Sequence, residues 1–415
     1  MSQDYPKVLV VTPTRFNLKA GGGVTMGNLF RGWPKSHLAQ VYATEFIPPD
    51  ETVCNKYISG RFNLEKLKPL NEGVLNELLN SKHNKYFYSS SSINVDDIFN
   101  RVKSRFQPDI IYTDARDNPP YYLWLGRVLA EKFKIPYVLH IMDDWPNRFV
   151  KQHNSAIDRL FVKQVFEKEF NSLISNSKLN ICISPEMAVE YKERYEKDFV
   201  PFHNTIDIDE WFQHEKYYSQ DEETFSIVYI GAVTADKELY SLIDIKDAVV
   251  ALNEEGINCQ FHVYTADVWR EPAEKHLTAV NVSGYAGFID RADLPAILTA
   301  SDLLVLPINF DEKSLEYIKL SIQTKVPEYM ASGTPSLVYA PAASPNARYA
   351  REEGWGAVVS ERNVKLLKEK IKELILDEDL RKSLGNRGRE VVKKNHSAFI
   401  IREKFKNYLK KAIDE

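Results

Sequence analysis

Short, continuously apolar runs alternate with longer amphipathic segments along the whole chain, and this alternation restricts the fold more than any other feature. The apolar runs have the character of buried strands and cover residues 7–11, 109–113, 137–141, 180–184, 226–230, 261–265, 303–307 and 336–340. Between and after them, apolar residues recur at helical spacing, as in Leu367, Ile371, Leu374 and Ile375, and in Ile401, Phe405, Tyr408 and Leu409. Apolar strands that alternate with helices form parallel sheets covered on both faces. The pattern therefore predicts an α/β fold.

The chain is too long for one ordinary hydrophobic core. Its 415 residues fit two domains. Residues 200–224 interrupt the rhythm with a polar, aromatic and finally acidic stretch, which we interpret as the connection between the domains. We predict two doubly wound, Rossmann-like domains that face a cleft, with the boundary between residues 203 and 204. Ligands of such sheets bind beyond the carboxyl ends of the strands.

Charge and cysteine content exclude several classes of protein. The net charge of -4 argues against nucleic acid as a partner. No segment approaches the roughly 18 apolar residues that span a bilayer, and the first residues lack the basic region of a signal peptide. Cys54, Cys182 and Cys259 are far apart, without the spacing of metal ligands. We expect a cytoplasmic protein with reduced thiols, no metal and no cofactor.

A run of three glycines follows the first apolar strand at some distance. Gly22 and Gly23 precede a predicted helix from about Val24, and their amides could approach a phosphate at its N-terminus. The spacing is not that of a dinucleotide fingerprint, which places its glycines directly after the strand. A flexible loop before a helix explains the same residues.

His140 ends the strand at 137–141 and is followed by the acidic pair Asp143 and Asp144. A strand end is where a residue that faces a ligand belongs, although a lone histidine there is more often structural. Adjacent carboxylates project in different directions and no histidine or glutamate accompanies them, so a metal site is disfavoured.

Gly231 and Lys237 follow the strand at 226–230. A lysine near the start of the next helix could reach an anion held at the helix N-terminus. A solvated surface lysine explains the same position.

The most informative stretch is TKVPEYMASGTPSL at residues 324–337. Pro327 suits the first turn of a helix, so Glu328 lies in that turn and Lys325 just precedes it. Unpaired N–H groups around Thr324 and Val326 are expected to point into the cleft. This arrangement suits the diphosphate and ribose of a nucleotide sugar. A plain capped helix, with Glu328 complementing the helix dipole, is the alternative.

Several ordered segments together resemble the GT-B glycosyltransferases, and within them the retaining enzymes often called family 4. The resemblance covers nearly the whole chain and is strongest from about 225 to 410. It is carried by VSGYAGFIDRADLPAILTASDLLVLP, VPEYMASGTPSLVYAPA, EEGWGAVVS and LILDEDLRKSLGNRGREVV, and more loosely by AGGGVTMGNL, HIMDDWP and NTIDIDEW. It implies an acceptor-binding domain over 1–203, a nucleotide-sugar-binding domain over 204–390, and a C-terminal helical segment, 391–415, that crosses back to the first domain.

The chain departs from the family pattern at two positions. The common pattern has a glutamate eight residues before Glu328, where this chain has Leu320. An arginine commonly follows the glycine of the first C-terminal strand, where this chain has Ala232. We expect Lys325 to replace the missing phosphate-binding cation.

The resemblance implies transfer of a sugar from a nucleotide diphosphate to an acceptor hydroxyl with retention. Lys237, Lys325 and the amides near 22–23 and 324–326 would stabilise the departing diphosphate without a metal. Glu328 would hold the ribose and His140 would contact the donor sugar. The predicted donor-binding set is Gly22, Gly23, Gly231, Lys237, Thr324, Lys325, Val326 and Glu328.

The expected acceptor is a glycan or a lipid-linked glycan of a bacterial surface-polysaccharide pathway. Peripheral membrane contact is a further expectation, through Lys404, Lys406, Lys410 and Lys411 of the last helix or through residues 159–170. Two alternatives stay open: a nucleotide-sugar epimerase of the same fold, and a non-catalytic subunit that binds a nucleotide sugar.

Overall fold

The chain divides into two compact units. A computed structural model describes residues 4–17, 21–42, 48–60, 95–114, 121–147, 167–168, 170–216 and 224–415. Unit 1 comprises residues 1–202 and 400–415, and unit 2 comprises residues 203–399. Most of the basic and aromatic segment 159–170, which the sequence suggests as a membrane contact, lies outside the described residues.

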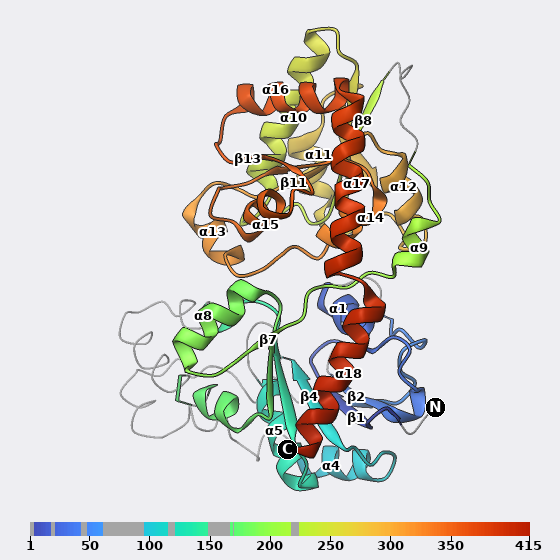
Figure 1. The fold of residues 1–415 in the computed structure, drawn as a ribbon, viewed down its shortest axis with the longest axis vertical. Coiled ribbons are helices and arrows are strands. Elements are labelled where there is room, and N and C mark those ends of the chain that lie inside the picture. Colours follow the sequence, from blue (N-terminus) through green and yellow to red (C-terminus); the bar gives the residue numbers. More distant parts are fainter. Residues whose placement is uncertain are drawn as a thin grey trace. The chain divides into compact units, whose positions relative to one another are not determined.

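Unit 1 is built on a seven-stranded sheet of order β3-β2-β1-β4-β5-β6-β7 (Figure 1). All of its strand pairings are parallel. The strands are β1 (Val8–Val11), β2 (Leu38–Tyr42), β3 (Tyr57–Ser59), β4 (Ile110–Asp114), β5 (Tyr137–Ile141), β6 (Leu179–Cys182) and β7 (Val200–Pro201).

Side chains of β1 alternate between two cores, one on each face of this sheet. Val8 and Val10 belong to one cluster, and Leu9 and Val11 to the other, because successive strand residues point to opposite faces. Helices of the described part of the unit include α1 (Gly21–Phe30), α4 (Val95–Lys103), α5 (Tyr121–Phe133), α8 (Pro185–Tyr195) and most of α18 (Ala398–Asp414). The predicted doubly wound arrangement is therefore present in unit 1.

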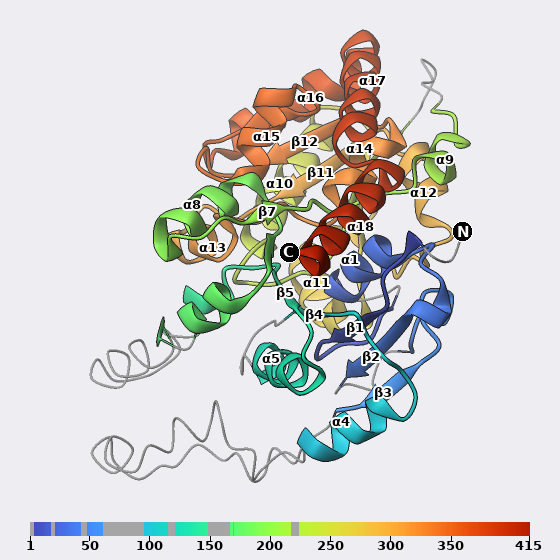
Figure 2. The same ribbon diagram turned by 60° about the horizontal axis from the view of Figure 1, so that its bottom comes forward.

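The last helix, α18, packs against α1 in unit 1, as Figures 1 and 2 both show. The ring of Phe405 lies 5.1 Å from that of Phe30 between centroids, edge to face. Ile401, Phe405 and Leu409 are buried, as their helical spacing predicts. The C-terminal helix and the N-terminal helix thus share one core.

Unit 2 contains a six-stranded parallel sheet of order β10-β9-β8-β11-β12-β13. Its strands are β8 (Phe225–Ile230), β9 (Cys259–Tyr264), β10 (Ser283–Gly287), β11 (Leu303–Pro307), β12 (Ser336–Tyr339) and β13 (Ala357–Val359). Its helices are α9 (Ile208–Phe212), α10 (Leu239–Glu254), α11 (Arg270–Leu277), α12 (Leu294–Ala300), α13 (Glu312–Ile318), α14 (Val326–Ser332), α15 (Pro345–Glu353), α16 (Val364–Leu376) and α17 (Glu378–Asn395).

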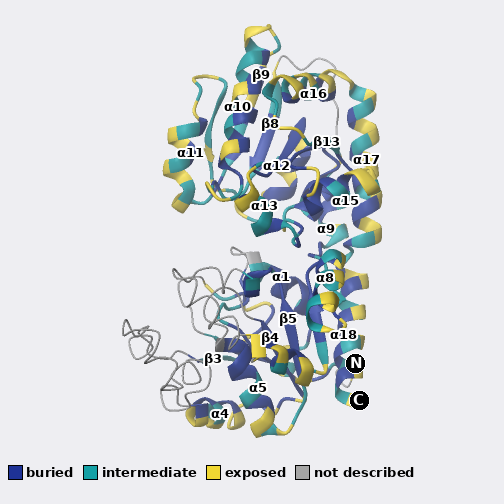
Figure 3. Cartoon of the chain, turned by 90° about the vertical axis from the view of Figure 1, so that its left-hand side faces the viewer, coloured by how far each residue is buried: buried dark blue, intermediate teal, exposed yellow. Residues whose placement is uncertain are grey.

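The helices of unit 2 cover both faces of its sheet. Residues of α10, α11 and α16 share one core with Ile227 and Tyr229 of β8, and residues of α9, α12, α14, α15 and α17 share another with Val228. Figure 3 shows the strands as mainly buried and the outer helix faces as exposed. Leu367, Ile371, Leu374 and Ile375 are fully buried, which confirms the predicted inward face of α16. No helix in the described parts of the chain is both long and apolar enough to cross a membrane.

The apolar runs of the sequence did not predict β2, β3, β7, β10 or β13. β2 contains Gln40, which is fully buried. Its amide oxygen accepts from Phe16 N–H at 3.0 Å and its amide nitrogen donates to Thr12 Oγ1 at 2.8 Å. A polar side chain that is fully bonded in this way interrupts an apolar pattern without interrupting the strand. β3, β7 and β13 are too short to show a pattern, and β10 is an edge strand that is only partly buried.

The segment interpreted as a connection, 200–224, belongs largely to unit 2 where it is described. The chain passes into unit 2 at His203 and returns to unit 1 at Ile400. Trp211 of α9 is 3% exposed and packs in a core of unit 2. Residues 391–399, which the sequence analysis groups with the C-terminal helix, also belong to unit 2, because α17 continues to Asn395.

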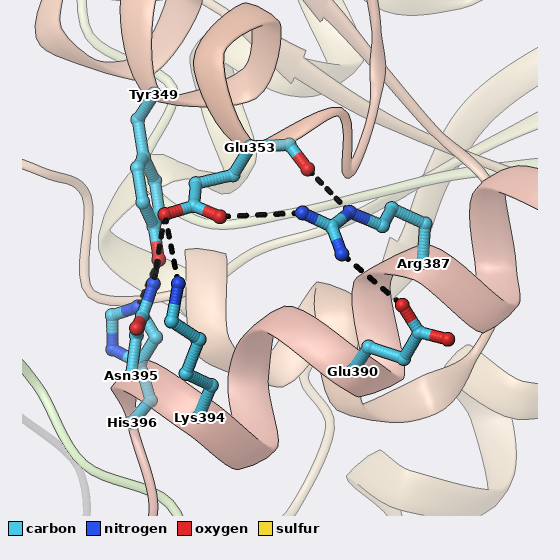
Figure 4. A network of polar contacts seen from close by, with 7 residues as sticks. All are labelled: Tyr349, Glu353, Arg387, Glu390, Lys394, Asn395 and His396. Atoms are coloured by element: carbon cyan, nitrogen blue, oxygen red, sulfur yellow. Dashed lines mark hydrogen bonds and ion pairs between the residues drawn. The ribbon is translucent and has the colours of Figure 1, made fainter.

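A buried histidine joins the two passages of the chain within unit 2. His396 Nδ1 lies 2.8 Å from Asn204 O, so Nδ1 carries the hydrogen and donates it. His396 Nε2 therefore accepts from Tyr349 OH at 2.9 Å, and Asn395 Nδ2 donates to the same hydroxyl at 3.1 Å (Figure 4). Ile206 N–H also donates to His396 O at 2.9 Å. Burial lowers the pKa of His396, so the imidazole is neutral and Nε2 is the acceptor in this series.

Glu353 extends this network along α17. Its side chain accepts from Asn395 at 3.4 Å, and its carbonyl oxygen accepts from Arg387 Nε at 2.6 Å (Figure 4). Lys394 lies 3.8 Å from the same carboxylate. The end of α15 is thereby fixed to α17.

We predict that His396 stays neutral down to acidic pH. Burial, followed by the neighbouring His203, lowers its pKa to about 3. The unfolded chain takes up a proton below pH 6.5 while the folded chain does not, so the stability that neutral His396 contributes is complete above pH 6.5 and declines as pH falls. Between pH 6.5 and 5 this amounts to about 2 kcal/mol.

The measurement is a ring-nitrogen NMR titration of the 9 histidines, with His396→Gln to assign the resonance. We expect no titration of His396 above pH 5, and a smaller loss of unfolding free energy on acidification in the variant than in the parent. A His396 resonance that titrates near pH 6.5 would contradict the assignment.

Candidate functional site

Two of the predicted site residues, Gly231 and Lys325, meet at the carboxyl end of β8 in unit 2, and Lys237 and Glu328 are near enough to affect the charge of Lys325. Gly231 directly follows this strand and has a φ of +148°. A Cβ at this position would lie 2.3 Å from Lys325 Nζ and 2.9 Å from Tyr229 Oη. The backbone conformation favours glycine here, and a Cβ would also displace the end of the Lys325 side chain.

Lys325 immediately precedes α14 and reaches back to β8. Its ammonium nitrogen lies 4.2 Å from the centroid of the Tyr229 ring, a cation–π contact. The Tyr229 hydroxyl donates to Ala232 O at 2.6 Å, which fixes the ring. The predicted neighbours Gly231 and Lys325 are thus in contact, although they are far apart in the sequence.

The surroundings of Lys325 perturb its charge. Its pKa is lowered to about 8, mainly by burial and to a smaller extent by the nearby Lys237, against the opposing effect of the carboxylates of Glu238 and Glu328. A lysine whose pKa lies this close to neutral pH is unusual, because the ordinary pKa of a lysine side chain is about 10.4. Perturbed groups of this kind cluster at functional sites.

Lys237 places its ammonium over a second aromatic ring. Its nitrogen lies 3.9 Å from the centroid of Tyr317, a residue of α13. The backbone of Lys237 is fixed as well, because its carbonyl oxygen accepts from Asn309 N–H at 2.6 Å. The side chain of Asn309 caps the adjacent turn, accepting from Tyr240 N–H and donating to Ala235 O.

Glu328 lies in the first turn of α14, as predicted, and is 22% exposed at its side chain. Its carboxylate is 3.9 Å from Arg291 Nη1. Burial raises the pKa of Glu328, Arg291 and Lys325 lower it, and Glu210 of α9 raises it. Arg291, from the loop after β10, thus adjoins the candidate site and was not predicted from the sequence.

The amides at the start of α14 differ from expectation. Val326 N–H is not free but donates to Gln323 O at 3.1 Å, and the Val326 side chain is fully buried in a core of unit 2. A turn before the helix therefore uses this amide. Thr324 is exposed, and its role in donor binding stays a prediction.

The predicted residues of unit 1 are placed differently. α1 begins at Gly21 rather than Val24, so Gly22 and Gly23 form its first turn. A Cβ on Gly23 would lie 1.8 Å from Asn17 Nδ2 and 2.9 Å from Arg15 O. Close packing thus accounts for Gly23, and phosphate contacts by Gly22 and Gly23 stay a prediction.

His140 is fully buried in unit 1. Its Nδ1 lies 2.5 Å from the hydroxyl of Tyr112, whose ring packs against Phe30 and Phe405. The contact of His140 with a donor sugar stays a prediction, and it would require the groups that cover the imidazole to move.

Asp144 has a structural partner. Its carboxylate accepts from Arg194 at 2.8 and 3.1 Å and from Tyr191 OH at 2.9 Å. A bidentate pair of this kind occupies both oxygens. Within the described residues, no cluster of histidine, cysteine and acidic side chains has the arrangement of a metal site.

Residues 209–391 match the family model described as glycosyl transferases group 1. No curated protein matches the chain.

Solved structures match over nearly the full length of the chain. Sucrose-phosphate synthase from Thermosynechococcus elongatus is 15% identical, with a TM-score of 0.65 over 98% of this chain and 98% of its own. Anabaena HepE, crystallised in complex with UDP, is 15% identical, with a TM-score of 0.63 over 98% and 100%. A glycosyltransferase from Rickettsia africae is 13% identical, with a TM-score of 0.60 over 97% and 98%. At these identities the likeness establishes the fold.

We predict that Gly231→Ala disrupts the contact between β8 and Lys325. The φ of +148° is strained for alanine and the methyl group would overlap Lys325 Nζ, so a loss of about 1–3 kcal/mol in unfolding free energy is expected. The matched control is Gly284→Ala, because a Cβ at Gly284 meets nothing within 4 Å. Denaturant unfolding of both variants provides the measurement. Equal stabilities would show that Gly231 is not constrained in this way.

Proposed function

We propose that the protein belongs to the glycosyl transferases group 1 family, whose model matches residues 209–391, and that it transfers a hexosyl group from a nucleotide diphosphate to an acceptor hydroxyl with retention of configuration. The observation that carries the proposal is the position of the Lys325 ammonium over Tyr229 of β8, where Lys237 and Glu328 are near enough to affect its charge. Support for the donor class comes from the fold, which is shared with structures crystallised with UDP and UDP-glucose.

The two ammonium groups would hold the diphosphate. Lys237 and Lys325 each rest on an aromatic ring, so both positive charges are in place before the donor binds. Negative charge grows on the diphosphate as the glycosidic bond breaks, and preorganised cations stabilise that charge. We therefore propose that these lysines supply the stabilisation that other enzymes obtain from a metal ion.

Glu328 would bind the ribose. A carboxylate can accept hydrogen bonds from two neighbouring hydroxyls. Arg291 and Lys325 favour its charged form against burial. Glu328 of the predicted ribose site and Lys325 of the predicted phosphate site therefore lie on one short segment.

Retention would follow from attack on the face that the diphosphate leaves. A departing phosphate oxygen can accept the proton of the acceptor hydroxyl, and the sugar then receives the acceptor oxygen on the same side. Glycosidases that retain configuration instead use two carboxylates about 5 Å apart.

The acceptor and the location of the reaction are proposed from the family resemblance. We propose a glycan or lipid-linked glycan acceptor in bacterial surface-polysaccharide synthesis at the cytoplasmic face of the membrane. The basic residues of α18 support membrane contact only in part. Lys406 and Lys410 form ion pairs with Asp4 at 2.8 and 2.7 Å, and Lys406 is 7% exposed at its side chain. Lys404 and Lys411 are the exposed lysines of this helix.

A second candidate is a subunit that binds a nucleotide sugar without transferring it. Leu320, at the place of the family's first glutamate, is 6% exposed, and an apolar side chain there cannot bond a sugar hydroxyl. Incubation with donor alone, and then with acceptor glycans, separates the possibilities. Transfer supports the enzyme, an isomerised sugar supports an epimerase, and binding without reaction supports the silent subunit.

We predict that Lys325→Met and Lys237→Met each lower the turnover by about 10²–10³-fold, the effect of removing one preorganised charge. Lys313→Met is the matched control, because Lys313 lies near by but is 78% exposed and pairs with Asp236. Turnover is measured with the best donor from a panel of nucleotide sugars. A parent-like rate in both site variants would exclude this diphosphate site.

We predict that Glu328→Gln separates nucleoside recognition from phosphate recognition. Loss of the ribose acceptor is expected to weaken UDP binding about tenfold or more, because a hydrogen bond to a charged group contributes about 1.5–3 kcal/mol. Binding of inorganic pyrophosphate, which has no ribose, is expected to change less than threefold. Calorimetry on both ligands provides the test, and equal losses for the two would assign Glu328 to the phosphates.

A further inference from the structure

Glu238 is a deeply buried carboxylate beside the two candidate phosphate-binding lysines. It is 5% exposed and directly precedes α10. Thr234 Oγ1 donates to its carboxylate at 2.9 Å, and Glu238 N–H donates back to Thr234 O at 3.1 Å. Both the backbone and the side chain of Glu238 are thereby fixed.

Complementing the dipole of α10 does not explain this burial. Glu238 occupies the N-cap position, but its side chain makes no capping hydrogen bond to the helix. A carboxylate that only complements a helix dipole can remain in water. Burying a charge is costly unless an opposite charge is near, so Glu238 requires a cationic partner.

Lys325 is the cation that most favours the charged form of Glu238. Burial raises the pKa of Glu238, and Lys325 is the strongest of the groups that lower it, followed by Lys237. In return, Glu238 is the strongest of the groups that raise the pKa of Lys325. Tyr229 belongs to the same cluster, because its ring carries the Lys325 ammonium and its own pKa is raised by burial and by Glu238.

We propose that Glu238 is a positioning residue, which keeps the Lys325 ammonium charged and in place beside Gly231, where the donor diphosphate would bind. The inference rests on the proposed function. It also accounts for Ala232. Arginine, which commonly occupies that place in the family, is charged at any physiological pH, whereas a half-buried lysine is not. In this chain a lysine from α14 and a carboxylate from the start of α10 together replace it.

The proposal makes the binding of an anion depend on pH in a defined direction. The charged groups that face Lys325 are Glu238, Glu328 and Lys237. Lys325 binds a diphosphate in its ammonium form, which is lost as pH rises through about 8. Removing the Glu238 charge lowers the pKa of Lys325, so binding must weaken at a lower pH.

The first experiment measures the dissociation constant of UDP from pH 6 to 9 for the full chain, Glu238→Gln and Asp236→Asn. Glu238→Gln is nearly isosteric and keeps an acceptor for Thr234. We expect its midpoint of binding loss to lie about one pH unit below that of the parent. Asp236, two residues away and exposed, is the matched control, and its variant is expected to follow the parent. Glu238→Asp, which retains the charge, is expected to have a midpoint of binding loss close to that of the parent.

The second experiment needs no ligand. In protein labelled with 13C at lysine Cε, the Lys325 resonance is assigned with Lys325→Met and titrated in the parent and in Glu238→Gln. A lower titration midpoint in Glu238→Gln supports the positioning role. The same midpoint in both proteins overturns it. If UDP fails to bind the parent, the proposed function is in error, and this titration still decides the role of Glu238.

Discussion

The candidate site depends on one interaction, the contact of the Lys325 ammonium with the face of Tyr229 beside Gly231. The contact joins the end of β8 to the start of α14, two elements far apart in the sequence. It requires a glycine at 231, a fixed aromatic ring at 229 and a lysine that turns back from its helix. The carboxylates of Glu238 and Glu328 favour the charged form of this lysine. The remaining site residues are arranged around this contact.

The sequence predicted the layered fold because strands buried on both faces leave an unmistakable apolar pattern. Each predicted run coincides with a strand of one of the two sheets to within a residue or two. Strands that depend on tertiary contacts were missed. β2 contains Gln40, whose hydrogen-bond partners Thr12 and Phe16 come from the loop after β1. Pairing of this kind cannot be read from local pattern.

The sequence predicted which residues belong to the candidate site but not which of them are in contact. Gly231, Lys325 and Glu328 were chosen from strand ends and a helix start, which are local features, and the structure brings Gly231 and Lys325 into contact. Glu238 and Arg291 were missed because their roles come from burial and from partners distant in the sequence. The free amide expected at Val326 was wrong, because a preceding turn uses it.

A crystal structure with UDP bound tests the central claim most directly. The account predicts diphosphate oxygens within about 2.7–3.2 Å of Lys325 Nζ, with the ribose hydroxyls on the carboxylate of Glu328. The ammonium would then bridge the anion and the Tyr229 ring. A diphosphate bound away from the end of β8, with Lys325 still in place on Tyr229 and making no contact with it, would contradict the account.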